Sequence, residues 1–387
     1  MTPFSIHVPE ARLADIRARV AAFPWDGVPP AEDWSGGVPV ETLKAAADHW
    51  LHRFDWRAVE ARLNGIPQYT VPVSVEGETL SLHVMVEPGS GPAPRPLVLL
   101  HGWPGSIVEF LDLVGPLAHP ERHGAPDAPA FTVIVPSLPG YGFSGRPARP
   151  IGPRRMAALL DGLLTGPLGL SDVLVQGGDW GSVIAGWMGL EGRAVGALHL
   201  NMYGWRAAGI APQTEEETAW AARTGGMFER EGAYFRIQAT KPQTLGYAMA
   251  DSPLGTAAWI LQAFHAWTEG GACALPGPFG WDRLLANIMF YVATGSFTSA
   301  ARTYQGFMAE LMDTARTPPP GTRITRPVGV AAFPGDPVYP WPPRSLAEKS
   351  YATILQWTDM PRGGHFAALE AGDLLLADIR AFARRLG

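Results

Sequence analysis

Residues 173–184 read Val-Leu-Val-Gln-Gly-Gly-Asp-Trp-Gly-Ser-Val-Ile, an apolar run followed by a glycine-rich turn and the start of a helical pattern. A sharp strand–turn–helix connection with small residues on both sides of one central residue is typical of a nucleophile presented at a strand end. That central residue is Asp179. A lone aspartate in a turn is usually a turn former or a helix cap. Because the strand, both flanks and the helix all match, the segment predicts an α/β fold with Asp179 as its nucleophile.

A carboxylate at this position indicates a particular chemistry. A serine in the same turn would attack a carbonyl carbon and would be released from an acyl ester. A carboxylate attacks a saturated carbon that bears a leaving group, and the alkyl ester it forms must then be cleaved by water. Asp179 therefore predicts hydrolysis of a strained or activated C–O bond or of a carbon–halogen bond.

The rest of the chain predicts the sheet around this turn. Short continuous apolar runs that alternate with helical patterns favour a mostly parallel sheet with helices on both faces. We expect strands at 97–100, 131–135, 198–200, 328–333 and 352–356, a hairpin over 69–86 and a final helix at 373–385. The predicted organisation is an N-terminal extension packed on the core (1–90), a first core part (91–204), a helical cap (205–320) and a second core part (321–387).

An acid and a base follow Asp179 in the order that this kind of fold uses. Asp336 comes directly after the strand predicted at 328–333, and His365 lies in a Gly-Gly-His-Phe loop before the last helix. His365 is predicted to be the base, although a histidine in such a loop can also be structural. Asp336 is the predicted acid, although it lies in an ordinary turn sequence and Glu348 or Asp359 could compete with it.

The segment His101-Gly-Trp-Pro-Gly-Ser106 follows the strand at 97–100, where a second oxyanion donor is expected. The predicted donors are the backbone N–H groups of Trp103 and Trp180. The same two indoles are candidates for contacts with an apolar substrate, although aromatic residues of this kind are also common in protein cores.

Composition excludes several classes of function. A net charge of −6 gives no reason to expect nucleic acid or an anionic membrane as a partner. The one cysteine, Cys273, cannot form an internal disulfide. No signal peptide and no run of about 18 apolar residues is present, so we expect a cytoplasmic protein without a membrane segment. Residues 140–145 match G-x-G-x-x-G, but the prolines around them contradict a dinucleotide site, and no motif predicts a metal.

Taken together, these motifs resemble the epoxide hydrolases of the α/β-hydrolase superfamily, on the microsomal or juvenile-hormone branch. The resemblance runs nearly from end to end. It is carried by residues 4–25 and 56–72, and by the core motifs at 101–106, 139–144, 177–182 and 363–370. It implies a small apolar epoxide as substrate, a vicinal diol as product and no cofactor.

The resemblance also implies two tyrosines in the cap that act as proton donors. The segment 231–242 resembles the one that carries the first, which is Tyr234 here, and 299–304 resembles the second, which ends at Tyr304. Phenol O–H groups can bind an epoxide oxygen and supply its proton; alternatively, both rings only pack the lid. The chain departs from its relatives in two ways: Asp336 stands where the acid is often glutamate, and no membrane anchor is present, which indicates a soluble bacterial-type member.

Two other functions fit the same residues. A haloalkane or haloacid dehalogenase shares the aspartate nucleophile, and Trp180 could bind its halide. Such an enzyme needs no proton donor, so the tyrosine pair discriminates between the two. A non-catalytic binding protein on this fold is the second alternative, but it would not need Asp179, His365 and the oxyanion segment together. The sequence leaves the oligomeric state open, a homodimer included.

Overall fold

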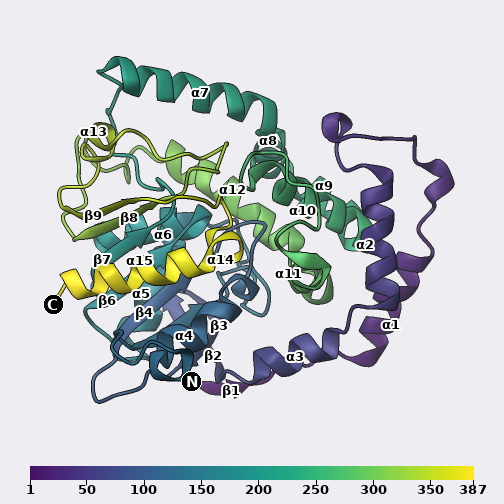
Figure 1. The fold of residues 1–387 in the computed structure, drawn as a ribbon, viewed down its shortest axis with the longest axis horizontal. Coiled ribbons are helices and arrows are strands. Elements are labelled where there is room, and N and C mark those ends of the chain that lie inside the picture. The colour runs from purple at the N-terminus through teal and green to yellow at the C-terminus, as the bar shows by residue number, and fades with distance from the viewer.

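The computed structural model describes residues 1–387 and centres on a nine-stranded sheet in the order β1-β2-β3-β5-β4-β6-β7-β8-β9 (Figure 1). Strands β4 to β9 pair in parallel, and β1 to β3 form an antiparallel edge. The predicted mostly parallel sheet is therefore confirmed. The strands are β1 (Thr2–Phe4), β2 (Gln68–Val75), β3 (Glu78–Glu87), β4 (Arg95–Leu100), β5 (Phe131–Pro136), β6 (Val173–Gly177), β7 (Val195–Leu200), β8 (Val328–Ala332) and β9 (Ile354–Asp359).

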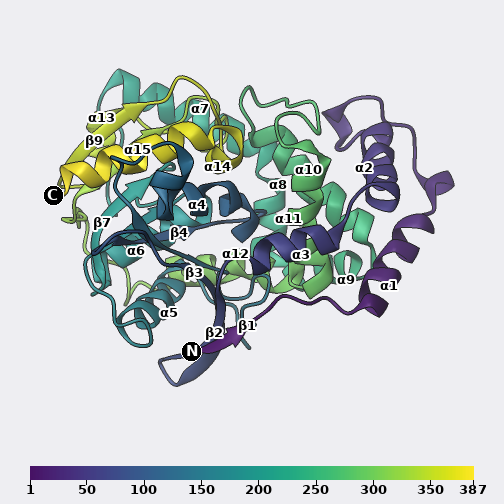
Figure 2. The same ribbon diagram turned by 60° about the horizontal axis from the view of Figure 1, so that its bottom comes forward.

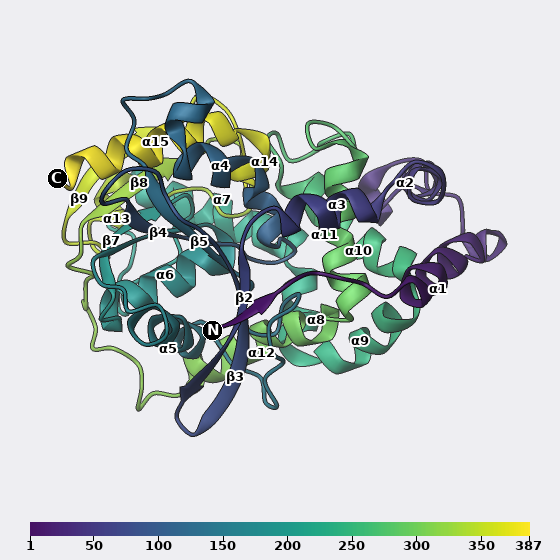
Figure 3. The same ribbon diagram turned by 90° about the horizontal axis from the view of Figure 1, so that it is seen from below.

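Helices cover both faces of this sheet, which is why its central strands are apolar throughout. Helices α4 (Leu111–Ala118) and α15 (Gly372–Arg385) pack together on one face. On the other face, α5 (Pro153–Thr165) packs against α6 (Asp179–Glu191). Figure 3 shows α4 and α15 on one side of the strands and α5 on the other. A strand with helices on both sides buries every side chain, and all five residues of β6 are buried.

Six helices lie between β7 and β8 in the sequence and form a separate layer beside the sheet (Figure 1). The chain leaves the sheet at the end of β7 and returns to it at β8, directly beside β7. This layer is therefore an insertion between neighbouring strands, and we call it the cap. The cap helices are α7 (Glu215–Glu231), α8 (Ala233–Thr240), α9 (Pro242–Asp251), α10 (Pro253–Trp267), α11 (Gly280–Thr294) and α12 (Phe297–Met312).

The first 90 residues contribute to both layers. Strands β1 to β3 belong to the central sheet itself. Helices α1 (Glu10–Ala21) and α2 (Val40–His52) contact α10 and α11 of the cap, at the end of the molecule farthest from the C-terminus (Figure 2). Helix α3 (Trp56–Asn64) leads from this pair back to the sheet. The N-terminal segment thus ties the cap to the core.

No single helix has the length and apolar character needed to cross a membrane. Only α11 and α12 taken together reach that length and composition, and a bend of 90° separates them.

Candidate active site

Asp179 stands at the junction of β6 and α6 with φ of +46°, a left-handed conformation that non-glycine residues rarely adopt. Close contacts around it require glycine. A Cβ on Gly177 would overlap the carbonyl of Gly181, and a Cβ on Gly181 would overlap the carbonyl of Leu100. Strained backbone of this kind costs about 1–3 kcal/mol and is concentrated at functional sites. The turn therefore holds the Asp179 side chain away from both the strand and the helix.

The two carboxylate oxygens of Asp179 have different partners. Oδ1 accepts a hydrogen bond from the backbone N–H of Trp103 at 2.8 Å. The N–H of Trp180 belongs to the first turn of α6, where amides have no partner within the helix. Oδ2 lies 3.3 Å from Nε2 of His365. One oxygen of Asp179 is thus bound by the Trp103 amide, while the other faces an imidazole.

His365 is held by an aspartate on its other side. Its Nδ1 lies 2.7 Å from Oδ2 of Asp336, and both residues are buried. The Oδ1 atom of Asp336 accepts from the backbone N–H groups of Val338 and Tyr339 at 3.0 and 2.8 Å, which fixes the carboxylate. Burial alone would lower the pKa of His365, but the carboxylates of Asp336 and Asp179 outweigh it and raise this pKa to about 10.

The two other acids considered for this role lie elsewhere. Glu348 pairs with Nε of Arg344 at 2.8 Å, and Asp359 accepts from the indole of Trp357 at 3.0 Å. Both carboxylates are engaged by these neighbours. The structure therefore brings Asp336, and neither of the alternatives, to His365.

Tyr234 of α8 and Tyr304 of α12 face the same cavity as Asp179. Their rings meet edge to face with centroids 5.7 Å apart. Tyr234 also stacks on Trp103, with centroids 5.2 Å apart, and Tyr304 meets the edge of Trp180 at 4.8 Å. Burial raises the pKa of both phenols well above its usual value, and the charge of Asp179 adds to the effect. Both tyrosines therefore stay protonated and are able to donate at any ordinary pH.

The shared cavity has a volume of about 1050 Å³. Trp180 lines this cavity, whereas Trp103 does not and instead lines a smaller cavity that also borders Asp179. A pocket of this size is at the upper end of the range for drug-sized ligands. Its lining includes aromatic and aliphatic side chains, among them Ile151, Val183, Trp187, Phe228, Phe235 and Phe307. Charged side chains such as Arg154, Glu310 and Arg316 line the same cavity.

Two residues of the site did not emerge from the sequence. The hydroxyl of Tyr339 lies 2.6 Å from that of Tyr234, and Glu109 lines the smaller cavity together with Asp179 and His365. Tyr339 follows Asp336 in a proline-rich turn that gives no sign of a contact with the cap. Glu109 did leave a signal, because it is a single carboxylate within the apolar run 107–110. No group of three or more His, Cys, Asp or Glu side chains is arranged to hold a metal ion.

Comparisons with known proteins find relatives of this chain. A family model described as "Epoxide hydrolase N terminus" matches residues 1–110, and one described as "alpha/beta hydrolase fold" matches 95–202. Epoxide hydrolase 1 of Oryctolagus cuniculus is 34% identical over 98% of this chain and 88% of its own length. Juvenile hormone epoxide hydrolase 2 of Ctenocephalides felis is 33% identical over 98% and 84%. The solved structure of Aspergillus niger epoxide hydrolase superposes with a TM-score of 0.83 at 31% identity, covering 100% of this chain and 96% of that one.

Proposed function

The chain belongs to the epoxide hydrolases of the α/β-hydrolase fold, and from this premise we propose that it opens an apolar epoxide through a covalent ester on Asp179. The observation that carries the proposal is the position of the Asp179 carboxylate. One of its oxygens is bound by the Trp103 amide, and the other lies 3.3 Å from the base and faces a cavity that also holds two phenols. This arrangement suits attack on a saturated carbon followed by attack of water on the resulting ester.

In the first step, an oxygen of Asp179 attacks one carbon of the oxirane, and the bond from that carbon to the ring oxygen breaks. The negative charge develops on the ring oxygen. Tyr234 and Tyr304 hydrogen-bond this oxygen and supply its proton, which their raised pKa values allow because both phenols stay protonated. The phenol that loses its proton regains one from the His365 imidazolium by way of solvent.

Formation of the ester prepares His365 for the second step. Asp179 loses its negative charge when it is alkylated, and that charge is one of the causes that raise the pKa of His365. The pKa of the imidazole therefore falls at the stage where a neutral base is needed. His365 removes a proton from water, and the hydroxide oxygen bonds to the carboxyl carbon of Asp179. The amides of Trp103 and Trp180 stabilise the oxyanion, worth about 3–4 kcal/mol per donor in comparable sites.

Collapse of this intermediate breaks the bond between the carboxyl carbon and the alkyl oxygen. The departing alkoxide takes the proton of the carboxylic acid that forms on Asp179, and the vicinal diol leaves with inversion at the carbon that Asp179 attacked. Asp179 and His365 return to the ionised pair of the resting enzyme. The atoms balance as one epoxide plus one water giving one diol, so the proposed cycle uses no cofactor. The aromatic lining of the cavity supports an apolar substrate.

Trapping the ester tests the proposal. His365→Ala should still be alkylated but should not release the product. Intact mass after mixing with a panel of aryl and alkyl epoxides should then show an increase equal to the whole epoxide, located on Asp179 by peptide mapping. The double variant Asp179→Ala/His365→Ala is the matched control and should gain no mass. An unmodified His365→Ala protein with every epoxide, or diol formation by Asp179→Ala, would contradict the mechanism.

The same assay separates this function from dehalogenation. An adduct from a haloalkane would lack the halogen, whereas an adduct from an epoxide keeps its oxygen. Tyr234→Phe combined with Tyr304→Phe removes both proton donors, so it should abolish epoxide opening and hardly affect displacement of a halide.

A further inference from the structure

A second, much smaller cavity lies against Asp179. Its volume is about 20 Å³, and Asp179 is the one residue that it shares with the lining of the large cavity. A space of about one probe sphere, 10–15 Å³, is what a single buried water molecule requires. The nucleophile therefore separates a chamber large enough for an organic substrate from one that fits about one water.

The small cavity contains polar atoms that make no hydrogen bond. Oε1 of Gln176 is buried without a partner, and Nε2 of His365 has only its ionic contact with Oδ2 of Asp179 at 3.3 Å; both residues line the cavity. The side-chain amide of Gln176 is fixed, because its Nε2 donates to Oδ1 of Asn201 at 2.7 Å. A buried water is stable where it finds two to four such partners. This chamber is thus suited to a water molecule within reach of His365.

Glu109 provides a further polar group in this chamber. It is half-buried and enters from the segment that follows the oxyanion turn. A Cβ on Gly105 would overlap its Oε1 atom, so the carboxyl occupies space that only glycine at position 105 leaves free. Burial raises the pKa of Glu109 to about 8, with His365 opposing the shift and Asp179 adding to it. The carboxyl is therefore electrostatically coupled to both residues that act in the second step.

We propose that Glu109 is the water-positioning residue of the hydrolytic step, with its carboxyl oxygen accepting one O–H of the water whose other O–H points to His365. Two acceptors then fix the orientation of the water, and its remaining lone pair faces the carboxyl carbon of the Asp179 ester. The proton still goes to Nε2 of His365, and Glu109 gains and loses none. This inference rests on the proposed covalent mechanism, in which no other step uses the Glu109 carboxyl.

The test separates the two half-reactions. Glu109→Met keeps the approximate volume and removes the acceptor, so hydrolysis of the ester should slow about 10-fold, the value of one lost contact of about 1.4 kcal/mol. Alkylation should be unchanged. Both rates are measured with an aryl epoxide by rapid-quench intact mass, which counts ester-bearing protein, and by the change in intrinsic tryptophan fluorescence. Steady-state kcat should fall while kcat/KM, which reports alkylation, stays constant.

Two further variants keep the inference testable if Glu109→Met does not fold. Glu109→Gln retains an acceptor oxygen and should keep hydrolysis within about threefold of the original rate. Gly105→Ala should slow hydrolysis as Glu109→Met does, because its methyl group displaces the carboxyl without removing it. Glu60→Gln is the control for the loss of a buried glutamate remote from the site, where it accepts from Val8 and Trp56, and it should leave both rates unchanged.

Unchanged ester hydrolysis in Glu109→Met and Gly105→Ala would overturn the inference. Equal slowing of alkylation and hydrolysis would also overturn it, since that pattern indicates a general disturbance of the site. Absence of any ester, in these variants and in His365→Ala alike, would refute the covalent mechanism instead. The two failures are therefore distinguishable.

Discussion

The hydrogen bond between the hydroxyls of Tyr234 and Tyr339 determines the direction in which the O–H of Tyr234 points. The two oxygens are 2.6 Å apart, and burial raises the pKa of both phenols. Of the two hydroxyl protons of two neutral phenols this close, one lies in the hydrogen bond between the oxygens and the other is free to bind elsewhere. If Tyr339 donates, the proton of Tyr234 is free to point toward the oxirane oxygen. Tyr339 comes from the same turn as Asp336, so one loop positions both the acid that holds His365 and the tyrosine of the cap.

Tyr339→Phe should therefore slow alkylation about 3- to 10-fold, the effect of one neutral hydrogen bond. The rate of ester hydrolysis should not change, because His365 and Asp336 keep their contact. Single-turnover measurements of both rates check this, with Tyr234→Phe as the reference for complete loss of that donor. If Tyr339→Phe slows hydrolysis and leaves alkylation alone, its role lies with Asp336 and the prediction is wrong.

Individual site residues are predicted best where the neighbouring residues in the chain also determine the local backbone geometry. The turn that carries Asp179 was recognisable because a sharp turn of this kind needs glycines beside its central residue, and Gly177 and Gly181 lie within two residues of it in the chain. Asp336 and His365 followed from their places after a strand and before a helix, although no spacing could exclude Glu348 or Asp359. Tyr339 was not predictable, because its contact with Tyr234 joins residues 105 positions apart and depends on how the cap is seated.

Helix α5 shows how one element depends on another for its stability. Its N-cap residue, Gly152, provides no side-chain acceptor. The carboxylate of Glu310, near the end of α12, instead accepts from the backbone N–H groups of Arg154 and Arg155 at 3.0 and 3.1 Å. A cap helix therefore satisfies the free amides of a core helix, and an anion at a helix N-terminus is also favoured by the helix dipole.

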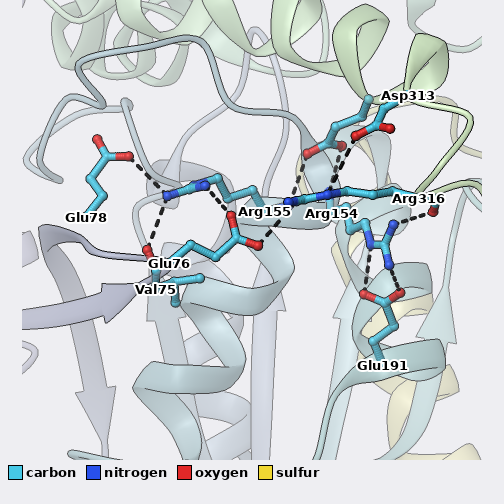
Figure 4. Close-up of polar contacts among 9 residues, drawn as sticks. Val75, Glu76, Glu78, Arg154, Arg155, Glu191, Asp313 and Arg316 are labelled. Atoms are coloured by element: carbon cyan, nitrogen blue, oxygen red, sulfur yellow. Dashed lines mark hydrogen bonds and ion pairs between the residues drawn. The ribbon is translucent and has the colours of Figure 1, made fainter.

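Charged side chains surround this junction (Figure 4). Arg154 forms an ion pair with Glu191, and Arg155 forms one with Glu76 on the turn between β2 and β3, which Arg316 also contacts. These pairs are partly exposed, and such pairs contribute about 0–1 kcal/mol. The half-buried contact of Glu310 with two backbone amides should therefore matter more to the position of α12, the helix that carries Tyr304.

Glu310→Ala should lower the free energy of unfolding by about 1 kcal/mol, the usual cost of removing a helix N-cap. Glu310→Gln keeps an acceptor oxygen and should lose less. The control is Glu191→Ala, which removes an exposed partner of Arg154 and should change stability by less than about 0.5 kcal/mol. Urea unfolding of the three variants measures these differences. Equal losses in Glu310→Ala and Glu191→Ala would show that the ion pairs, and not the contact of Glu310 with the N-terminus of α5, stabilise the junction.

Element boundaries were predicted where the pattern itself ends. Alternation stops at 76–78 on both sides, which predicts the hairpin turn there; the turn itself is Glu76-Gly77, both with positive φ, and β3 already begins at Glu78. Strand β7 begins at Val195, three residues before the predicted start, because pairing with β6 continues past the interruption at Gly196. Strand β1 was missed altogether. Three residues are too few to show alternation, and pairing with β2 is what defines them.

The arrangement of the whole molecule was less accessible from the sequence than its parts. The buried apolar side chains form one continuous cluster through the sheet, the cap and the N-terminal helices. Contacts such as the one from Arg12 of α1 to the carbonyl of Val292 at 2.7 Å join segments 280 residues apart. Local periodicity predicts each helix but does not encode its partner. The order of the parts was therefore predictable, whereas the contact of α1 and α2 with the cap was not.

The buried ionisable groups give the whole molecule a defined dependence of stability on pH. The folded-state pKa is raised to about 10 for His365 and to about 8 for Glu109. A group with a raised pKa binds its proton more tightly in the folded state, so its contribution is complete below the unfolded pKa and is lost as pH rises through the folded one. For Glu109 the loss runs from about pH 4.5 to 8, and for His365 from about 6.5 to 10.

Two other histidines act in the opposite direction at lower pH. Burial lowers the pKa of His83 to about 3 and of His101 to about 4. Both are neutral in the folded protein and become charged only on unfolding, so they destabilise the fold as pH falls below 6.5, the ordinary value for histidine. Above that pH they no longer contribute to the slope, and the decline there isolates Glu109 and His365.

The free energy of unfolding should therefore decrease from pH 6.5 to 9, by up to ~1.4 kcal/mol per pH unit for each group that is still protonated only in the folded state. His365→Gln removes the contribution of the imidazole and leaves that of Glu109, so its stability should decline less between pH 8 and 9 than that of the original protein. Glu109→Gln should retain the decline above pH 8, since His365 still titrates there. Urea unfolding at pH 6.5, 7.5, 8 and 9 measures these slopes. Parallel curves for the original protein and His365→Gln would mean that the paired imidazole does not control the alkaline limb, and the pairing of Asp179, His365 and Asp336 would then have to be weaker in solution than the geometry indicates.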